Sequence, residues 1–123
     1  MTHEGGSKIE ELRKFKEAER PLVWVSPSSE RGISLEDEMC RWVVWCKAPF
    51  LSLADKIVAA RVYGSSVGNA WYRSDMLQTV VQGCGRAVRS KEDYAVSYIL
   101  DGQITKALSE NPLMVPGWWR AAL

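Results

Sequence analysis

The residues best suited to do chemistry are gathered in one segment, 82–89, whose sequence is Gln-Gly-Cys-Gly-Arg-Ala-Val-Arg. On a helix, with about 100° per residue, Gln82, Arg86 and Arg89 fall on one side within roughly 60° of one another. Arginine is always charged and offers planar pairs of N–H donors that match phosphate oxygens. The pattern therefore fits the binding of an anionic group such as a triphosphate. An exposed helix face with two solvated arginines is the alternative, and the spacing alone does not choose between them.

Two glycines stand inside this segment, at positions 83 and 85. In a helix interior each glycine costs about 1 kcal/mol relative to alanine. We expect the close approach of a ligand or of another backbone to compensate for this cost. The helix itself is expected over residues 70–88, with an apolar stripe on the side opposite the arginines.

The remaining elements must position this segment. Apolar and β-branched runs predict strands at 22–25, 41–46 and 94–100. Helical patterns cover 8–19, 52–62, 103–109 and 115–123. Strands that alternate with helices predict an α/β fold with a small, mainly parallel sheet of about three strands flanked by helices. Residues 1–7 are expected to form a flexible N-terminal lead, and residues 8–123 a single unit.

Composition limits the class of protein. The chain has 123 residues, 46% hydrophobic and 25% charged, with a net charge of +1, which is typical of one globular domain. Residues 41–123 contain ten Lys and Arg against six Asp and Glu, a bias too weak to indicate nucleic acid by itself. No apolar run approaches the ~20 residues of a membrane span, so no membrane partner is expected.

Three cysteines and one histidine provide no ligand set for zinc, since no Cys-x-x-Cys pair is present. Free and mostly buried thiols in a reducing compartment are expected, which predicts a cytoplasmic protein.

The segment at 82–89 reproduces Gln-x-x-Gly-Arg-x-x-Arg, motif VI of superfamily 2 helicases, at every fixed position. Residues 29–35 resemble the motif V segment, and residues 47–56 resemble the Lys-x-Pro-aromatic segment of the DinG/XPD-like branch and its phage relatives. From about Ile9 to its C-terminus, the chain thus resembles the C-terminal part of the second RecA-like domain of such a DNA helicase.

The resemblance implies a role for each matched residue. Arg86 and Arg89 would be arginine fingers that reach the phosphates of ATP across a cleft, and Gln82 would position them or the attacking water. The residues expected at the ATP cleft are Gly32, Ser34 and Gly85. Those expected to contact nucleic acid are Ser28, Ser29, Arg31, Trp71 and Tyr72. For the two aromatic residues, internal packing and stacking on single-stranded DNA remain equal alternatives.

Two departures and two missing motifs limit the expected activity. Motif V normally has acidic residues where this chain has Arg31 and Ser34. The sequence contains no Gly-x-x-x-x-Gly-Lys-Ser/Thr loop and no Asp-Glu-x-His/Asp box after a strand. ATP and Mg²⁺ are therefore expected to be bound mainly by a missing half. The chain alone is expected to bind neither, to hold no metal and to be inactive.

The expected partners are an N-terminal helicase half or another helicase chain, and single-stranded DNA. A homo-oligomer through an exposed sheet edge is also expected. The alternative function is a non-catalytic module, derived from a truncated helicase, that binds nucleic acid or regulates a helicase.

The tryptophans are interpreted as structural. Trp24, Trp42 and Trp45 lie in expected strands and are predicted to be core residues. Trp118 and Trp119 are predicted to dock a terminal helix; if exposed, they would instead mark a partner surface.

Overall fold

The computed structural model describes residues 8–27, 33–35, 37–88 and 90–123. At its centre lies a two-stranded parallel sheet of β1 (Trp42–Trp45) and β2 (Val96–Ile99). The register pairs Trp42 with Val96 and Val44 with Tyr98. Strands joined through a helical crossover confirm the predicted α/β class with a small parallel sheet.

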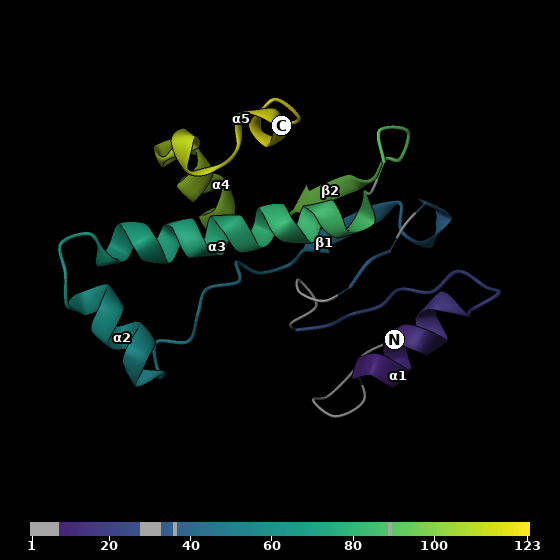
Figure 1. Cartoon of the computed structure of the whole chain (residues 1–123), viewed down its shortest axis with the longest axis horizontal. Helices are drawn as coiled ribbons and strands as arrows, with labels where there is room; N and C mark the ends of the chain where they lie inside the picture. The colour runs from purple at the N-terminus through teal and green to yellow at the C-terminus, as the bar shows by residue number, and fades with distance from the viewer. Residues whose placement is uncertain (1–7, 28–32, 36, 89) are drawn as a thin grey trace.

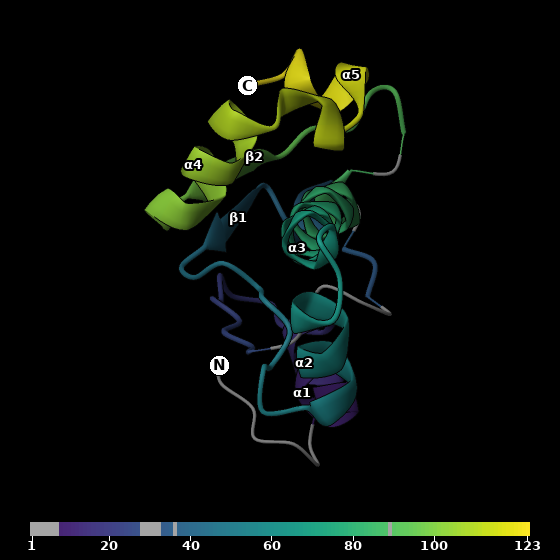
Figure 2. The ribbon, with the colours of Figure 1, turned by 90° about the vertical axis from the view of Figure 1, so that its left-hand side faces the viewer.

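Helices account for most of the remaining structure. Between the strands run α2 (Lys56–Tyr63) and α3 (Gly68–Cys84), and α4 (Gly102–Glu110) follows β2. The other elements are α1 (Lys8–Lys16), α5 (Gly117–Arg120) and three 3₁₀ turns, η1 (Asp37–Met39), η2 (Gly85–Ala87) and η3 (Pro112–Met114). In Figures 1 and 2, α4 and α5 lie above α3, whereas α1 and α2 lie below it. No helix in the described part of the chain has the length and apolar character to cross a membrane.

The expected strand at 22–25 did not form, so the sheet of the described residues has two strands rather than about three. Only Val25 makes a single-residue bridge. The alternation of exposed and packed side chains along residues 22–25 explains why this segment did not form a strand. Val23 and Val25 are exposed, while Trp24 packs beside Phe15 of α1, with 6.1 Å between ring centroids. The large side chain of this segment therefore packs on α1 rather than in the core beside the sheet, and the two valines on its other face remain in contact with solvent.

The core lies between the sheet and the helices on one of its faces. Met76, Leu77, Val80 and Ile104 are fully buried, and Trp45 packs against them. Burying side chains of this size contributes about 1.5–3 kcal/mol each, so α3 and α4 are fixed mainly by this cluster.

Two predictions about tryptophans need correction. Trp42 is 48% exposed, because side chains alternate along a strand and the core covers only the face that bears Trp45. Trp119 is buried and docks α5 as predicted, but its neighbour Trp118 is exposed.

A capping residue sets the start of α2. Asp55 is the N-cap, and its carboxylate accepts hydrogen bonds from the N–H groups of Ile57 and Val58. The helix begins at residue 56 as a result. The cap is worth about 1 kcal/mol.

Candidate functional site

The motif-VI-like segment passes through three backbone conformations. The α3 helix ends at Cys84, residues 85–87 form the tighter turn η2, and Val88 is extended with φ −133° and ψ 120°. The predicted helix to residue 88 is therefore wrong at its C-terminal end, and a single helical face for the amide and both guanidiniums does not apply. Glycine at position 85 favours this break because it is a poor helix former. Arg89 lies outside the described residues.

The two glycines of the segment have different surroundings. A Cβ at Gly83 would overlap the indole ring of Trp45, which packs across α3 from β1. The close approach expected at this glycine is thus made by a core side chain rather than by a ligand or a backbone. At Gly85 an added Cβ would meet no heavy atom of the described residues within 4 Å. Gly83 serves packing, whereas Gly85 adjoins open space.

The chain before β1 contacts the turn that carries Arg86. The N–H of Leu35 donates to the carbonyl oxygen of Arg86 at 3.0 Å, and Ile33 is buried. Ser34, expected at the ATP cleft, lies half-buried between these two anchors. Part of the motif-V-like segment therefore lies beside the motif-VI-like segment. The other residues predicted in this region, Gly32, Arg31, Ser28 and Ser29, lie outside the described residues.

Within η2, Arg86 is half-buried and the next residue, Ala87, is fully buried. Gln82 lies on α3 and lines an open hollow of about 420 Å³ between that helix and residues 113–116. The buried alanine anchors the turn next to Arg86. The amide of Gln82 and the guanidinium of Arg86 are presented from adjoining but distinct elements.

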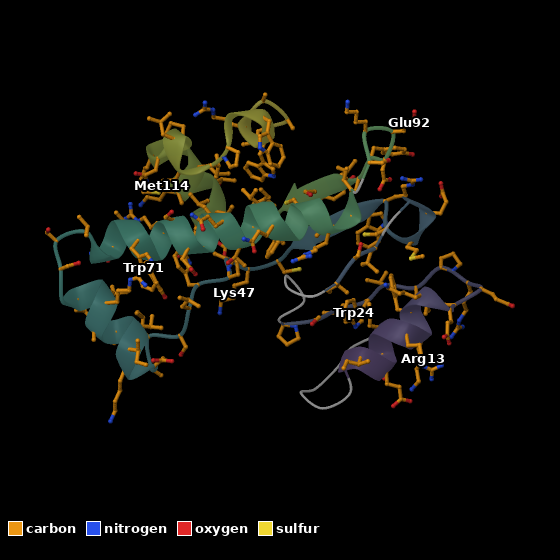
Figure 3. All side chains as sticks on the ribbon, viewed as in Figure 1. Arg13, Trp24, Lys47, Trp71, Glu92 and Met114 are labelled. Atoms are coloured by element: carbon orange, nitrogen blue, oxygen red, sulfur yellow. The ribbon has the colours of Figure 1, made fainter. Side chains whose placement is uncertain are left out.

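The aromatic pair at positions 71 and 72 has partners within the chain. The Arg61 guanidinium carbon lies 4.0 Å from the centroid of the Trp71 ring, which lies in the N-terminal half of α3 on the side facing α2 (Figure 3). Tyr72 stacks on Phe50 at 4.8 Å, and its hydroxyl donates to the carbonyl oxygen of Leu51 at 2.6 Å. Burial raises the pKa of Tyr72. Tyr72 thus ties the segment after β1 to α3.

Asp101 joins the C-terminal ends of the two strands. Its carboxylate accepts from the N–H of Ala48 at 2.7 Å and from the N–H of Gln103 at 2.8 Å, which caps α4. These two backbone hydrogen bonds lower the pKa of Asp101, and the bond from Ala48 has the larger effect. No motif in the sequence assigned a role to this residue, although an Asp directly before a predicted helix is a recognisable capping signal.

A second polar cluster holds the start of β1. Arg41 donates to Asp93 at 2.8 Å and to Glu38 at 2.6 Å, and its guanidinium lies 4.5 Å from the centroid of the Tyr94 ring. The hydrogen bond to Glu38 is the main cause of the raised pKa of Arg41. The cluster links η1 to the turn that leads into β2. η1 follows Leu35, whose N–H bonds to the carbonyl oxygen of Arg86, and the turn that leads into β2 follows η2 in the chain.

The thiols and candidate metal ligands are dispersed. No three His, Cys, Asp or Glu side chains in the described ranges are grouped so that they could hold a metal ion. Cys84 is buried and Cys40 is half-buried, and burial raises the pKa of Cys40. Cys46 is exposed, which departs from the expectation of mostly buried thiols.

Comparison with known families gives a match over almost the whole chain. The family model described as Helicase C-terminal domain matches residues 1–122. A search of curated proteins found no match.

Proposed function

Because the chain belongs to the Helicase C-terminal domain family, we propose that it is the C-terminal segment of an ATP-dependent DNA helicase of the DinG/XPD-like branch. In this role Arg86 and Arg89 are motif VI arginine fingers, presented to ATP that is bound by a partner half. The partner is an N-terminal helicase half or another helicase chain.

The placement of Arg86 carries this proposal. The arginine stands on a short turn that is anchored by the buried Ala87 and by the hydrogen bond from Leu35. Beside it, Gly85 leaves room for an approaching group. An arginine whose backbone is fixed in this way, beside a glycine that borders open space, suits a residue that must reach a phosphate held by another domain.

The chemistry asked of these residues is electrostatic. In ATP hydrolysis a water oxygen bonds to the γ-phosphorus and the water gives up a proton, while the bond to the β–γ bridging oxygen breaks and ADP leaves. Negative charge is spread over the oxygens of the transferring phosphoryl group and the bridging oxygen. Arg86 and Arg89 stabilise that charge without transferring a proton, and Gln82 positions them or the water. Gly32, Ser34 and Gly85 border the ATP cleft.

ATP and Mg²⁺ are bound mainly by the partner half in this proposal. The 123-residue sequence contains no phosphate-binding Gly-x-x-x-x-Gly-Lys-Ser/Thr loop. We also propose that Ser28, Ser29 and Arg31 contact the phosphates of single-stranded DNA. A DNA base stacks on Trp71 or Tyr72 only over the part of the ring that Arg61 or Phe50 leaves uncovered.

The test is reconstitution of ATPase activity. The purified chain is mixed with an N-terminal helicase half that carries the phosphate-binding loop and the DEAH-type box, and ATP hydrolysis is measured with and without single-stranded DNA. We expect DNA-stimulated hydrolysis from the mixture and none from the chain alone. Arg86→Ala should lower kcat by about 10³-fold or more.

A matched control is Arg13→Ala, since Arg13 lies on α1 in an exposed ion pair with Glu17. This variant should keep the wild-type rate. Arg86→Lys keeps the charge but loses the planar pair of donors, so its rate should fall between those of wild type and Arg86→Ala. Unchanged activity of Arg86→Ala in an active mixture would remove the finger assignment.

The second candidate is a non-catalytic module that binds single-stranded DNA or occupies the cleft of another helicase. The substitutions Arg31 and Ser34 in the motif-V-like segment favour it. This candidate predicts that the chain binds an N-terminal half and lowers the ATPase rate of an intact helicase, instead of creating activity. Titration of the chain into a complete helicase separates the two functions.

A further inference from the structure

One face of the β1–β2 sheet has no covering layer in the described structure. Along each strand the exposed positions are the residues whose side chains point away from the core. We call this surface the open sheet face and define it as Trp42, Val44, Val96 and Tyr98. None of the four carries a charge, and Trp42 and Tyr98 are each about half exposed, at 48% and 53%.

An uncovered face is unusual for a parallel sheet, because such sheets are normally buried on both sides. The exposed residues Cys46 and Leu100 continue the uncharged surface beyond one end of the strands, and Tyr94 extends it beyond the other end, where its ring lies against the guanidinium of Arg41. The three aromatic side chains, at 150–250 Å² each and about half exposed, contribute roughly 300 Å², and the four smaller uncharged residues bring the surface to roughly 500 Å². That is the range of the largest patch on a typical monomer and approaches the roughly 800 Å² that each partner buries in a standard interface.

The arrangement of large and small side chains indicates the occupant. The register places Trp42 beside Val96 and Val44 beside Tyr98, so the two aromatic rings occupy one diagonal of the face and the two valines the other. A two-fold axis in the plane of the interface, along or across the strands, brings each large side chain of one copy onto a small one of its partner. The face is therefore complementary to itself in shape.

We propose that two copies of this chain pack through the open sheet face and form a helix–sheet–sheet–helix homodimer. Packed sheets of this kind stand about 10 Å apart with interdigitating side chains. Because the face has no charge, two copies meet without like-charge repulsion. Aromatic residues at its centre are the residue types that dominate interface energies.

This arrangement differs from association through the strand edges, which the sequence also allows. Edge pairing would use backbone N–H and C=O groups and would leave Trp42 and Tyr98 in water. Packing through the face buries both rings and leaves the edges free. Substitutions that change only side chains on the face therefore distinguish the two arrangements.

The test is sedimentation equilibrium of the full chain over a wide range of concentrations. The wild type should change reversibly from monomer to dimer and no further. Val44→Lys introduces a charge onto the face and should weaken dimerisation at least about tenfold. The matched control is Val67→Lys, at a site 66% exposed directly before α3, which should dimerise like the wild type. Circular dichroism verifies that each variant is folded.

A mixing experiment tests whether the occupant is a second copy. If the two-fold axis runs along the strands, Val44 of one copy faces Tyr98 of the other, so Val44→Lys is mixed with Tyr98→Glu. If the axis runs across the strands, Val44 faces Trp42, so Val44→Lys is mixed separately with Trp42→Glu. Each variant alone should be monomeric, and one of the two mixtures should recover a heterodimer.

Four outcomes would overturn the proposal. They are a monomer at every concentration, unchanged dimerisation of Val44→Lys, growth beyond a dimer without saturation, and failure of both mixtures. A chain that is monomeric alone but binds an N-terminal helicase half through Val44 would assign the face to that half instead.

Discussion

The backbone N–H of Leu35 donates a hydrogen bond to the carbonyl oxygen of Arg86, with 3.0 Å between nitrogen and oxygen. This bond connects the segment before β1 to the turn after α3. It satisfies a carbonyl group at the point where the regular hydrogen bonds of the helix end. The backbone that carries Arg86 is therefore fixed by a segment distant in sequence, and any movement of that segment acts directly on the turn.

Removal of this donor tests the connection. Leu35→Pro lacks the N–H and should lower the free energy of unfolding by about 1–2 kcal/mol, because a carbonyl loses its partner. Amide hydrogen exchange should become faster in residues 85–88. Leu35→Ala is the control, since it keeps the N–H and should leave exchange in the turn near the wild-type rate. Equal exchange in both variants would mean that the bond does not hold the turn.

Replacing each of the two glycines of the segment 82–89 with alanine should have opposite effects on the stability of the fold. Gly83→Ala places a methyl group against the Trp45 ring and should lower the free energy of unfolding by about 1–3 kcal/mol. Gly85→Ala meets open space at φ −70° and should be neutral or stabilising by up to about 1 kcal/mol. Chemical denaturation of both variants measures the difference.

The same pair also bears on the proposed ATP cleft. In the reconstituted helicase, Gly85→Ala should reduce ATPase activity although the fold is intact, because the methyl group would occupy space at the cleft. A stable Gly85→Ala variant with wild-type ATPase activity would place Gly85 outside the cleft.

Asp101 should make stability depend on pH in the acidic range. Its pKa is lowered in the folded chain, so the folded state favours the carboxylate more than the unfolded state does. The resulting stabilisation is complete above the unfolded pKa of about 4 and is lost as the pH falls through the folded value. Wild type should therefore exceed Asp101→Asn in melting temperature at neutral pH, and the two should converge in strong acid. A difference in melting temperature that stays constant with pH would contradict this role.

Much of the fold could be predicted from local patterns. Alternating β-branched and aromatic residues correctly placed β1 and β2, and helical periodicity placed α2, α3 and α4 to within a few residues. The predictions failed where contacts with residues distant in sequence determine the local structure. Trp24 packs on α1 instead of joining the sheet, and α3 ends at Cys84 because the next residues turn toward Leu35. Periodicity carries no information about either contact.

The candidate site, too, was predicted from the sequence only in part. Residue types and spacing made Gln82, Arg86 and Arg89 candidates for phosphate binding, because arginine chemistry is a property of the side chain, but they left an exposed face with solvated arginines as the alternative. Only the tertiary structure shows that Gln82 and Arg86 stand on different elements, that Gly83 makes room for Trp45 and that Gly85 adjoins open space. Likewise, the sequence determined that the strands carry apolar side chains on both faces. Only the structure shows that the helices cover one face of the sheet. A chain can cross from one strand to the next over either face, and the packing of the core determines which face the helices cover.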